Sequence, residues 1–345
     1  MGFARVIVGL GLSALLAQGV LAGELALGGE ANESTVEFQQ PLGISDNKVT
    51  SSDVTHVARS PATEAVQDPQ DVSVAPKAQP KLNSESYSFK TTVDDVKVIK
   101  WEGLGALVGI TALGAKSWDW GGSSFHFNNE HWFSKNTGSG GADKLGHAFT
   151  GYALTNAFAE RLQAKGRSPE RAALSASLLS TALMLYVEAF DGFSGDHGFS
   201  YEDVVMNSLG VGFAYLRQTN PRLKSLVDFR MEYKPSGYKG FKPLSDYEGQ
   251  KYLFALKLSG FKSLKQSPLR YFELQAGYYS RGFSKEARND GQFRRQNGFV
   301  GIGVNLSQLF FGYPSEADRY YERTGRFIFE HVQVPYTAIR AEKKF

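Results

Sequence analysis

The hydrophobic pattern of this chain changes its period at Pro221, and that change limits the possible fold more than any other feature. Before Pro221, apolar residues recur at the three-to-four-residue spacing of helices, and after it they alternate with polar residues as in strands. Helices followed by strands predict an α+β fold. We expect a bundle of about four apolar helices over residues 92–220, then an antiparallel β-rich region over residues 221–345, either a sheet or a partial barrel.

The helical half divides into four segments at turn and breaker residues. We expect helices from about residue 92 to 117, 142 to 165, 169 to 190 and 201 to 218. The apolar part of the first, residues 103–115, is too short to span a bilayer, which favours a buried core helix. Residues 172–187 carry no charge, so the third segment is either a central buried helix or one in contact with lipid. A long polar and aromatic loop, DWGGSSFHFNNEHWFSKNTGSGG, joins the first two helices, and loops of this length are often functional.

The second half contains five aromatic segments that resemble strands. They cover residues 227–233, 251–261, 270–283, 298–312 and 326–339. Five strands are too few for the usual spanning barrel of one chain, so we expect a sheet or partial barrel beside the helices. An outer-membrane barrel formed when several chains associate is a further alternative, and the sequence does not determine the oligomeric state.

The N-terminus indicates export. Residues 1–22 combine a positive charge, an apolar run and small residues Val20 and Ala22 at the spacing of a signal-peptidase site, although a retained membrane anchor has a similar pattern. Residues 23–91 are poor in aromatic residues and rich in Ser, Thr, Pro and Asp, which predicts a disordered spacer; His56 lies there. We therefore expect a protein of the cell envelope, in the periplasm and associated with a membrane, with the outer membrane favoured.

Composition excludes several classes of partner and site. The net charge is +3 and the basic residues are scattered, which argues against nucleic acid as a partner. The chain contains no cysteine, so it has no disulfide, no thiolate metal site and no lipobox cysteine.

Polar residues interrupt the apolar helices at positions that place them on common faces. Asp143 and His147 are four residues apart with Lys144 between them, and Asp203 and Asn207 repeat the spacing. Glu188 follows the uncharged residues 172–187, and Asp191 comes three residues later; a buried carboxylate at Glu188 needs a partner. If the helices pack as a bundle, these side chains converge. We predict a candidate catalytic cluster that consists of Asp143, Lys144, His147, Glu188, Asp203 and Asn207.

This cluster has three open interpretations. His147, Glu188 and Asp203 are suitable ligands for a divalent metal, which is the one cofactor that the sequence suggests. A carboxylate that orients His147 as a general base or nucleophile is the second interpretation. The third is structural: Asp143 as a helix N-cap, Ser200 with Asp203 as a capping box, and Lys144 or His147 as the partner of Glu188.

The same residues resemble a known family. DKLGH, a glutamate at the end of the next apolar helix, and D-x-x-x-N-x-x-G, together with the lead-in FHFNNEHWFSKNTGSGGADKLGH, resemble the YfiM-like predicted periplasmic lipoproteins, a domain of unknown function. The pattern is more distantly similar to VanZ-like membrane proteins. The resemblance covers residues 118–218. It implies an envelope protein whose marked positions include Gly210 besides the six cluster residues.

Two functions remain open from the sequence. The favoured one is a membrane-associated envelope protein that serves envelope assembly or lipid handling, with membrane lipid or another envelope component as its partner. The alternative is a hydrolase or transferase that acts on a lipid-linked or phosphorylated envelope substrate through the His/carboxylate cluster, with Lys144 as a charge clamp for an anionic group. No G-x-S-x-G, P-loop or H-E-x-x-H motif supports an established enzyme class.

Overall fold

A computed structural model describes residues 88–315 and 317–345 of the chain. The expected signal peptide (residues 1–22), His56 and nearly all of the expected spacer (residues 23–91) lie outside the described residues. The residues from 88 on belong to one compact unit of the α+β class, in which helices precede strands, as the change of period predicts.

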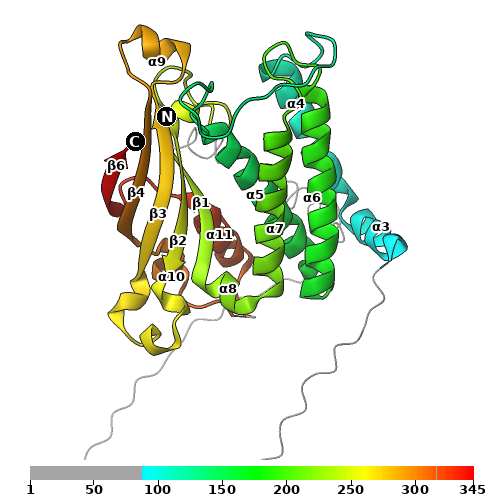
Figure 1. Cartoon of the computed structure of the whole chain (residues 1–345). Helices are drawn as coiled ribbons and strands as arrows, with labels where there is room; N and C mark the ends of the chain where they lie inside the picture. Colours follow the sequence, from blue (N-terminus) through cyan, green and yellow to red (C-terminus); the bar gives the residue numbers. More distant parts are fainter. Residues whose placement is uncertain (1–87, 316) are drawn as a thin grey trace, which may run out of the picture. The chain divides into compact units, whose positions relative to one another are not determined.

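Helices α5, α6 and α7 stand side by side and form the centre of the helical part (Figure 1). The helices of the described residues are α3 (Phe89–Val98), α4 (Lys100–Ser117), α5 (Ala142–Ala164), α6 (Pro169–Asp191), α7 (Tyr201–Thr219), α8 (Pro221–Leu226), α9 (Lys285–Asn289), α10 (Leu306–Phe311) and α11 (Tyr320–His331). The expected first helix is broken at Ile99, where α3 and α4 meet at 80°. Asp95 at the end of α3 is buried against Arg167 and Arg171, which ties α3 to the start of α6.

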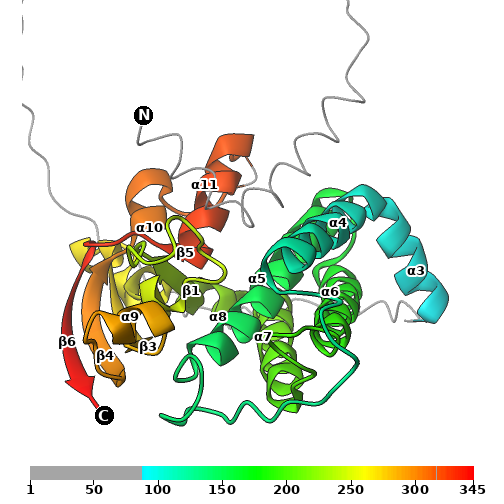
Figure 2. The ribbon, with the colours of Figure 1, turned by 90° about the horizontal axis from the view of Figure 1, so that it is seen from above.

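Two apolar clusters hold α5 in place. On one side Leu154, Phe158 and Leu162 pack against α4 and α6. On the other side Phe149 and Tyr152 pack against α7 and the first two strands, so α5 lies between the other helices and the sheet (Figure 2). By length and composition α6 is apolar enough to cross a membrane, as is the α3–α4 pair if it is counted as one bent segment. The core helix of a folded domain has the same composition, and α6 buries one face against α5 and α7 while Leu178 and Leu185 are exposed.

The sheet has six strands in the order β5-β1-β2-β3-β4-β6. Its strands are β1 (Val227–Tyr233), β2 (Gln250–Lys257), β3 (Phe272–Arg281), β4 (Arg295–Val304), β5 (Val332–Gln333) and β6 (Ala338–Lys344). All pairs are antiparallel except the short β1–β5 pair, so the sheet is mixed.

The expected bounds of two strands are partly wrong, because each includes residues that form a helix. Residues 306–311, expected at the end of a strand, form α10, and residues 326–331, expected to begin one, belong to α11. The phenylalanines of RFIFEH alternate, but Thr324, Phe327, Ile328 and His331 also follow the helical three-to-four-residue spacing, and the helix prevails.

The sheet curves strongly and has charged side chains on its inner face. Arg340 of β6 lies 2.8 Å (Nη2 to Oε2) from Glu232 of β1, although three strands separate β1 from β6 in the sheet. The same face buries Asp228, Arg230 and Glu273, which form ion pairs with one another. The opposite face is apolar; its β1–β2 part packs against α5 and α7 through Phe229 and Tyr252, and the rest is partly exposed. Its exposed residues are Phe254, Phe272, Leu274, Val300, Ile302 and Ile339. This polarity is the reverse of that in an ordinary half-buried sheet.

Candidate functional site

Lys144 lies at the centre of a buried group of carboxylates. Its Nζ is 3.0 Å from Oδ2 of Asp143, donates to Oδ2 of Asp203 at 3.0 Å, and also donates to Glu130 of the α4–α5 loop. The Lys144 side chain is fully buried. Burial lowers the pKa of Lys144, but the three carboxylates outweigh this effect and raise the pKa above its ordinary value. Lys144 therefore remains an ammonium ion and joins α5, α7 and the loop.

His147 lies one turn further along α5 and faces Asp203 and one more carboxylate, that of Glu188. Its Nδ1 is 3.1 Å from Oε1 of Glu188, and its Nε2 is 3.8 Å from Oδ1 of Asp203. Asn207 completes the group, because its Nδ2 donates to Oε1 of Glu188 at 2.9 Å and its Oδ1 lies 3.3 Å from Nδ1 of His147. Burial lowers the pKa of His147, but Asp203 and Glu188 raise it to about 10.

A close approach of α5 and α7 brings these residues together. A Cβ on Gly210 of α7 would lie 1.8 Å from the carbonyl oxygen of Ala148, so the two backbones meet at that glycine. Ser200 caps α7, and its Oγ accepts from the amide of Asp203 at 3.3 Å. The cap fixes the first turn of α7, and the Asp203 carboxylate then reaches Lys144 on α5.

The residues of this group suit a divalent cation. One imidazole nitrogen of His147 and one oxygen each of Glu188 and Asp203 lie within 4.8 Å of one another, and a nitrogen with two carboxylate oxygens is a usual ligand set for such ions. Oδ1 of Asp203, a residue only 4% exposed, accepts no hydrogen bond of good geometry in the described part of the chain, although Nζ of Lys144 lies 3.0 Å from it. Three carboxylates, those of Asp143, Glu188 and Asp203, face the two cationic side chains Lys144 and His147. Burial and the nearby Asp203 raise the pKa of Glu130 to about 8, so this fourth acidic group is mostly uncharged at neutral pH.

A second set of carboxylates, which consists of Glu130, Asp143 and Asp203, also brings its oxygens within 4.8 Å of one another. Lys144 already contacts all three, so an ammonium ion takes the position that a metal would need. The set with His147 is therefore the better candidate for a cation.

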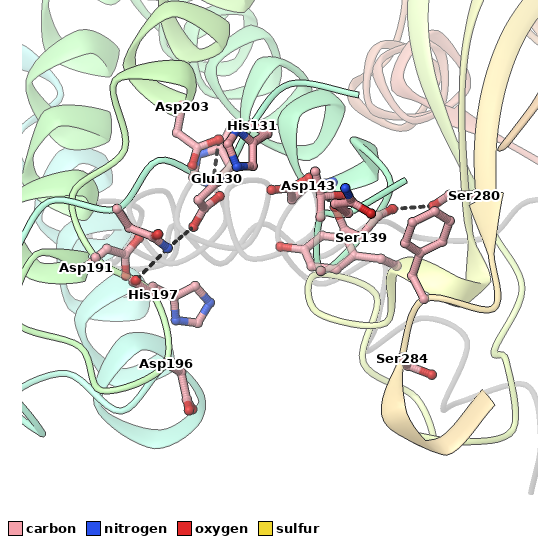
Figure 3. Close-up of a pocket in the computed structure, with 18 of the residues that line it drawn as sticks. Glu130, His131, Ser139, Asp143, Asp191, Asp196, His197, Asp203, Ser280 and Ser284 are labelled. Atoms are coloured by element: carbon pink, nitrogen blue, oxygen red, sulfur yellow. Dashed lines mark hydrogen bonds and ion pairs between the residues drawn. The ribbon is translucent and has the colours of Figure 1, made fainter. Parts of the chain in front are cut away.

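The cluster opens into a cavity of about 500 Å³ between the helical part and the sheet. Asp143, His147 and Asp203 line it together with acidic and histidine side chains that the cluster does not include: Glu130, His131, Asp191, Asp196, His197, Asp246 and Glu248. Figure 3 shows Glu130, Asp191, Asp203 and His197 on the helical side, with Ser280 and Ser284 on the sheet side. The cavity is thus strongly acidic beside the candidate cation site.

The sheet positions the loop that forms one wall of the cavity. Oγ of Ser280 donates to the carbonyl of Ser139 at 2.5 Å, and the hydroxyl of Tyr278 donates to the carbonyl of Gly140. Ser139 in turn donates to Asp143. The β-rich region therefore helps to orient the first turn of α5 and is part of the site's support.

The structure brings all six sequence-predicted residues into one connected group, with Glu188 behind His147 and away from the cavity wall. Two local expectations are wrong. Gly141, and not Asp143, is the N-cap of α5. Asp203 does not complete a capping box, because its carboxylate contacts Lys144. Lys144 has no exposed surface and three acidic partners, which leaves it no free face for a substrate.

Two further residues of the site, Glu130 and His197, were not assigned to it from the sequence, because they come from loops without periodicity. Asp191, which follows Glu188 by three residues at the end of α6 and was expected to converge with it, lines the cavity. Nε1 of Trp120 donates to Oδ1 of Asp191 at 2.6 Å. Burial raises the pKa of Asp191 to about 6, despite this hydrogen bond. The segment DGFSGDHG, with two acidic residues and a histidine among glycines, was the available signal.

A family model matches part of this chain. A family described as predicted periplasmic lipoprotein (DUF2279) matches residues 129–219, which include α5, α6, α7 and every residue of the cluster. No curated protein and no solved structure matches this chain. The match supports an exported protein of the periplasm and envelope. The YfiM-like assignment and the distant similarity to VanZ-like proteins remain predictions.

Proposed function

We propose that this envelope protein is a cation-dependent hydrolase or transferase that acts on a phosphorylated envelope substrate. The observation that carries the proposal is the group His147, Glu188 and Asp203, whose ligand atoms converge beside a cavity of about 500 Å³. A structural ion-pair network needs no such cavity. A cation bound by these residues supplies positive charge in an acidic pocket and so attracts an anionic group to it.

The residues of the chain have separate roles in this proposal. His147, Glu188 and Asp203 hold the cation, and Asn207 orients Glu188 through its hydrogen bond. Lys144 offsets the charge of Asp143 and Asp203 and keeps Asp203 in position. Lys144 acts as a positioning residue. A charge clamp for an anionic substrate would need an exposed ammonium group, and that of Lys144 is fully buried. Asp191 and His197 line the cavity beside His147 and are the candidates for proton transfer.

Calorimetric titration with Mn²⁺ tests the cation site directly. We expect one ion per chain in the wild type and at least 100-fold weaker binding in Glu188→Gln, because second-shell changes alone cost about 10- to 100-fold and a lost ligand costs more. Glu170→Gln is a matched control, since Glu170 is exposed on the same helix and lies at its other end. Equal binding by both variants, with circular dichroism like that of the wild type, would show that the cluster is a structural network only.

A second test concerns the reaction. Cells that produce His147→Ala at the wild-type level should accumulate a phosphorylated lipid or glycolipid that mass spectrometry of envelope extracts detects. Identical lipid profiles in the two strains would contradict an enzymatic role.

We further propose that the exposed apolar part of the sheet binds a membrane surface. Such binding is consistent with a role in lipid handling at the outer membrane. Leu274, Val300 and Ile302 are exposed on the part of the apolar sheet face that α5 and α7 do not cover, while the other face buries charges, the arrangement of a lipid-facing sheet. Residues 258–271, which join β2 to β3 beside this face, contain Lys262, Lys265 and Arg270 and no acidic residue. That charge complements an anionic lipid surface.

Flotation with phospholipid vesicles tests this surface. The double variant Val300→Ser/Ile302→Ser should float less with vesicles that contain anionic lipid. Leu178→Ser, which changes an exposed apolar residue of α6, is the control. Equal flotation of all three proteins would contradict the assignment of the sheet face.

A further inference from the structure

A second, mostly apolar crevice of about 80 Å³ lies beside the acidic cavity. Side chains from α4, α5, α6, β1, β2 and the loop before β2 line it. Its apolar members include Leu113, Phe149, Met184, Met231, Leu244 and Tyr252. Crevices of this kind bind hydrocarbon groups, because the transfer of apolar surface from water into an apolar environment is favourable.

The crevice and the acidic cavity share part of their walls. His147, Asp191, His197 and Tyr247 line both, so the two spaces meet at the histidine of the candidate cation site. A ligand held at His147 therefore has an acidic, polar space on one side and an apolar one on the other.

The inner wall of the crevice offers few free hydrogen-bonding groups. Oγ1 of Thr150 donates to the carbonyl of Gly146 at 2.8 Å. Nε2 of Gln250 donates to the carbonyl of Pro243 at 2.6 Å, and its Oε1 accepts from the hydroxyl of Tyr252 at 2.8 Å. A sugar or peptide placed there would lose hydrogen bonds to water without replacement, whereas a hydrocarbon chain loses none.

We infer that the substrate is an amphiphile, whose phosphate group binds at the cation held by His147, Glu188 and Asp203 and whose hydrocarbon segment enters the crevice between α5, α6 and the sheet. This inference rests on the proposed function, because it names the substrate class of the same site. It adds a specificity element that none of the six cluster residues supplies.

A series of n-alkyl phosphates tests the inference. In the presence of saturating Mn²⁺, the affinity of the wild type should rise by up to about fourfold per methylene group, which is the gain from one fully buried methylene. The gain should stop once the crevice is full. Inorganic phosphate, which has no chain, should bind most weakly.

The variant Thr150→Leu tests whether the alkyl chain binds in the crevice or on another apolar surface. The larger side chain fills the crevice, so the affinity should no longer depend on chain length while Mn²⁺ binding stays as in the wild type. Thr324→Leu on α11 is the matched control, because Thr324 also donates to the carbonyl four residues earlier. Leu244→Ser is a second variant that makes the wall polar, in case Thr150→Leu does not fold.

The outcomes distinguish the inference from the proposed function. If Mn²⁺ binds at the cluster but inorganic phosphate and octyl phosphate bind equally well, the amphiphile is wrong and the cation site stands. An unchanged dependence on chain length in folded Thr150→Leu and Leu244→Ser would also overturn the inference. If the wild type binds no Mn²⁺, the proposed function fails and the inference fails with it.

Discussion

Nδ1 of His147 lies 3.1 Å from Oε1 of Glu188, so a residue of α5 and one of α6 meet at the point where Asn207 of α7 also binds Glu188. The three helices therefore meet at one buried polar contact. Polar groups buried in such a place must all have partners for the bundle to remain stable. The site and the stability of the helical part thus depend on the same residues.

Lys144→Met should destabilise the protein strongly. The substitution keeps the length of the side chain but removes the ammonium partner of the partly buried Asp143 and the buried Asp203, which leaves only His147 as a nearby cation. Removing one partner of a buried ion pair typically costs about 3–5 kcal/mol, and we expect that loss in the free energy of unfolding measured with urea. Lys97→Met is the control, because Lys97 forms an exposed pair with Asp94 that contributes at most about 0.5 kcal/mol. A loss below about 1 kcal/mol at Lys144 would contradict the buried cluster.

Gly210→Ala and Gly212→Ala should have opposite effects although both lie in α7. A Cβ at position 210 meets the carbonyl oxygen of Ala148 at 1.8 Å, so α5 and α7 must separate at a cost of about 1–3 kcal/mol or more. A Cβ at position 212 has no neighbour within 4 Å, and alanine is a better helix former than glycine by about 1 kcal/mol. Thermal unfolding should show a lower midpoint for the first variant and an equal or higher one for the second. The reverse order would show that the helices do not cross at Gly210.

The helical half of the fold was predictable because its signals are local. The breaker sequence GRSP and Asn220-Pro221 mark helix ends, and the expected bounds of α5, α6 and α7 agree with the structure to within one residue. The bend at Ile99 was not predictable, because the packing of Asp95 against Arg167 and Arg171 depends on residues far along the chain. The helix α11 was missed because RFIFEH satisfies both periods.

The candidate site was predictable to the extent that it follows helical spacing. Asp143 with His147, and Asp203 with Asn207, share helix faces, and Glu188 stood out because uncharged residues precede it. Glu130 comes from a loop with no period, so nothing local indicated that its carboxylate reaches Lys144. The contribution of β3 through Tyr278 and Ser280 was also hidden, because it depends on how the sheet packs beside α5.

Arg340→Met should destabilise the sheet. Arg340 of the edge strand β6 pairs with Glu232 of β1 at 2.8 Å and also donates to Oε1 of Gln275 of β3 at 2.9 Å, so it joins β6 to β1 and β3 across the curved sheet. Methionine leaves Glu232 buried and unpaired, at a cost of about 3 kcal/mol in urea unfolding. Arg323→Met, at an exposed position of α11, should change the stability by less than about 0.5 kcal/mol. An equal loss of stability in Arg340→Met and Arg323→Met would mean that Arg340 does not reach Glu232 across the sheet.

His331 should make the stability of the protein fall below neutral pH. The side chain is fully buried, and its Nδ1 lies 2.7 Å from the carbonyl of Phe327. Burial, together with the nearby Arg217, lowers the pKa of His331 from 6.5 to about 4. Between these pH values the unfolded chain binds a proton that the folded chain does not. The free energy of unfolding is therefore unaffected by protonation of His331 above pH 6.5. As the pH falls from 6.5 toward 4, proton binding to His331 of the unfolded chain lowers this free energy by up to about 3 kcal/mol.

The variant His331→Phe keeps an aromatic ring between Phe327 and Tyr152 and cannot bind a proton. Urea unfolding at about pH 7 and about pH 4.5 should show a smaller loss of stability in this variant than in the wild type, although the carboxylates titrate equally in both. His131→Gln changes an exposed histidine and should keep the wild-type pH dependence. If His331→Phe also kept it, His331 would not be held neutral in the folded protein, and another buried group would have to cause the loss.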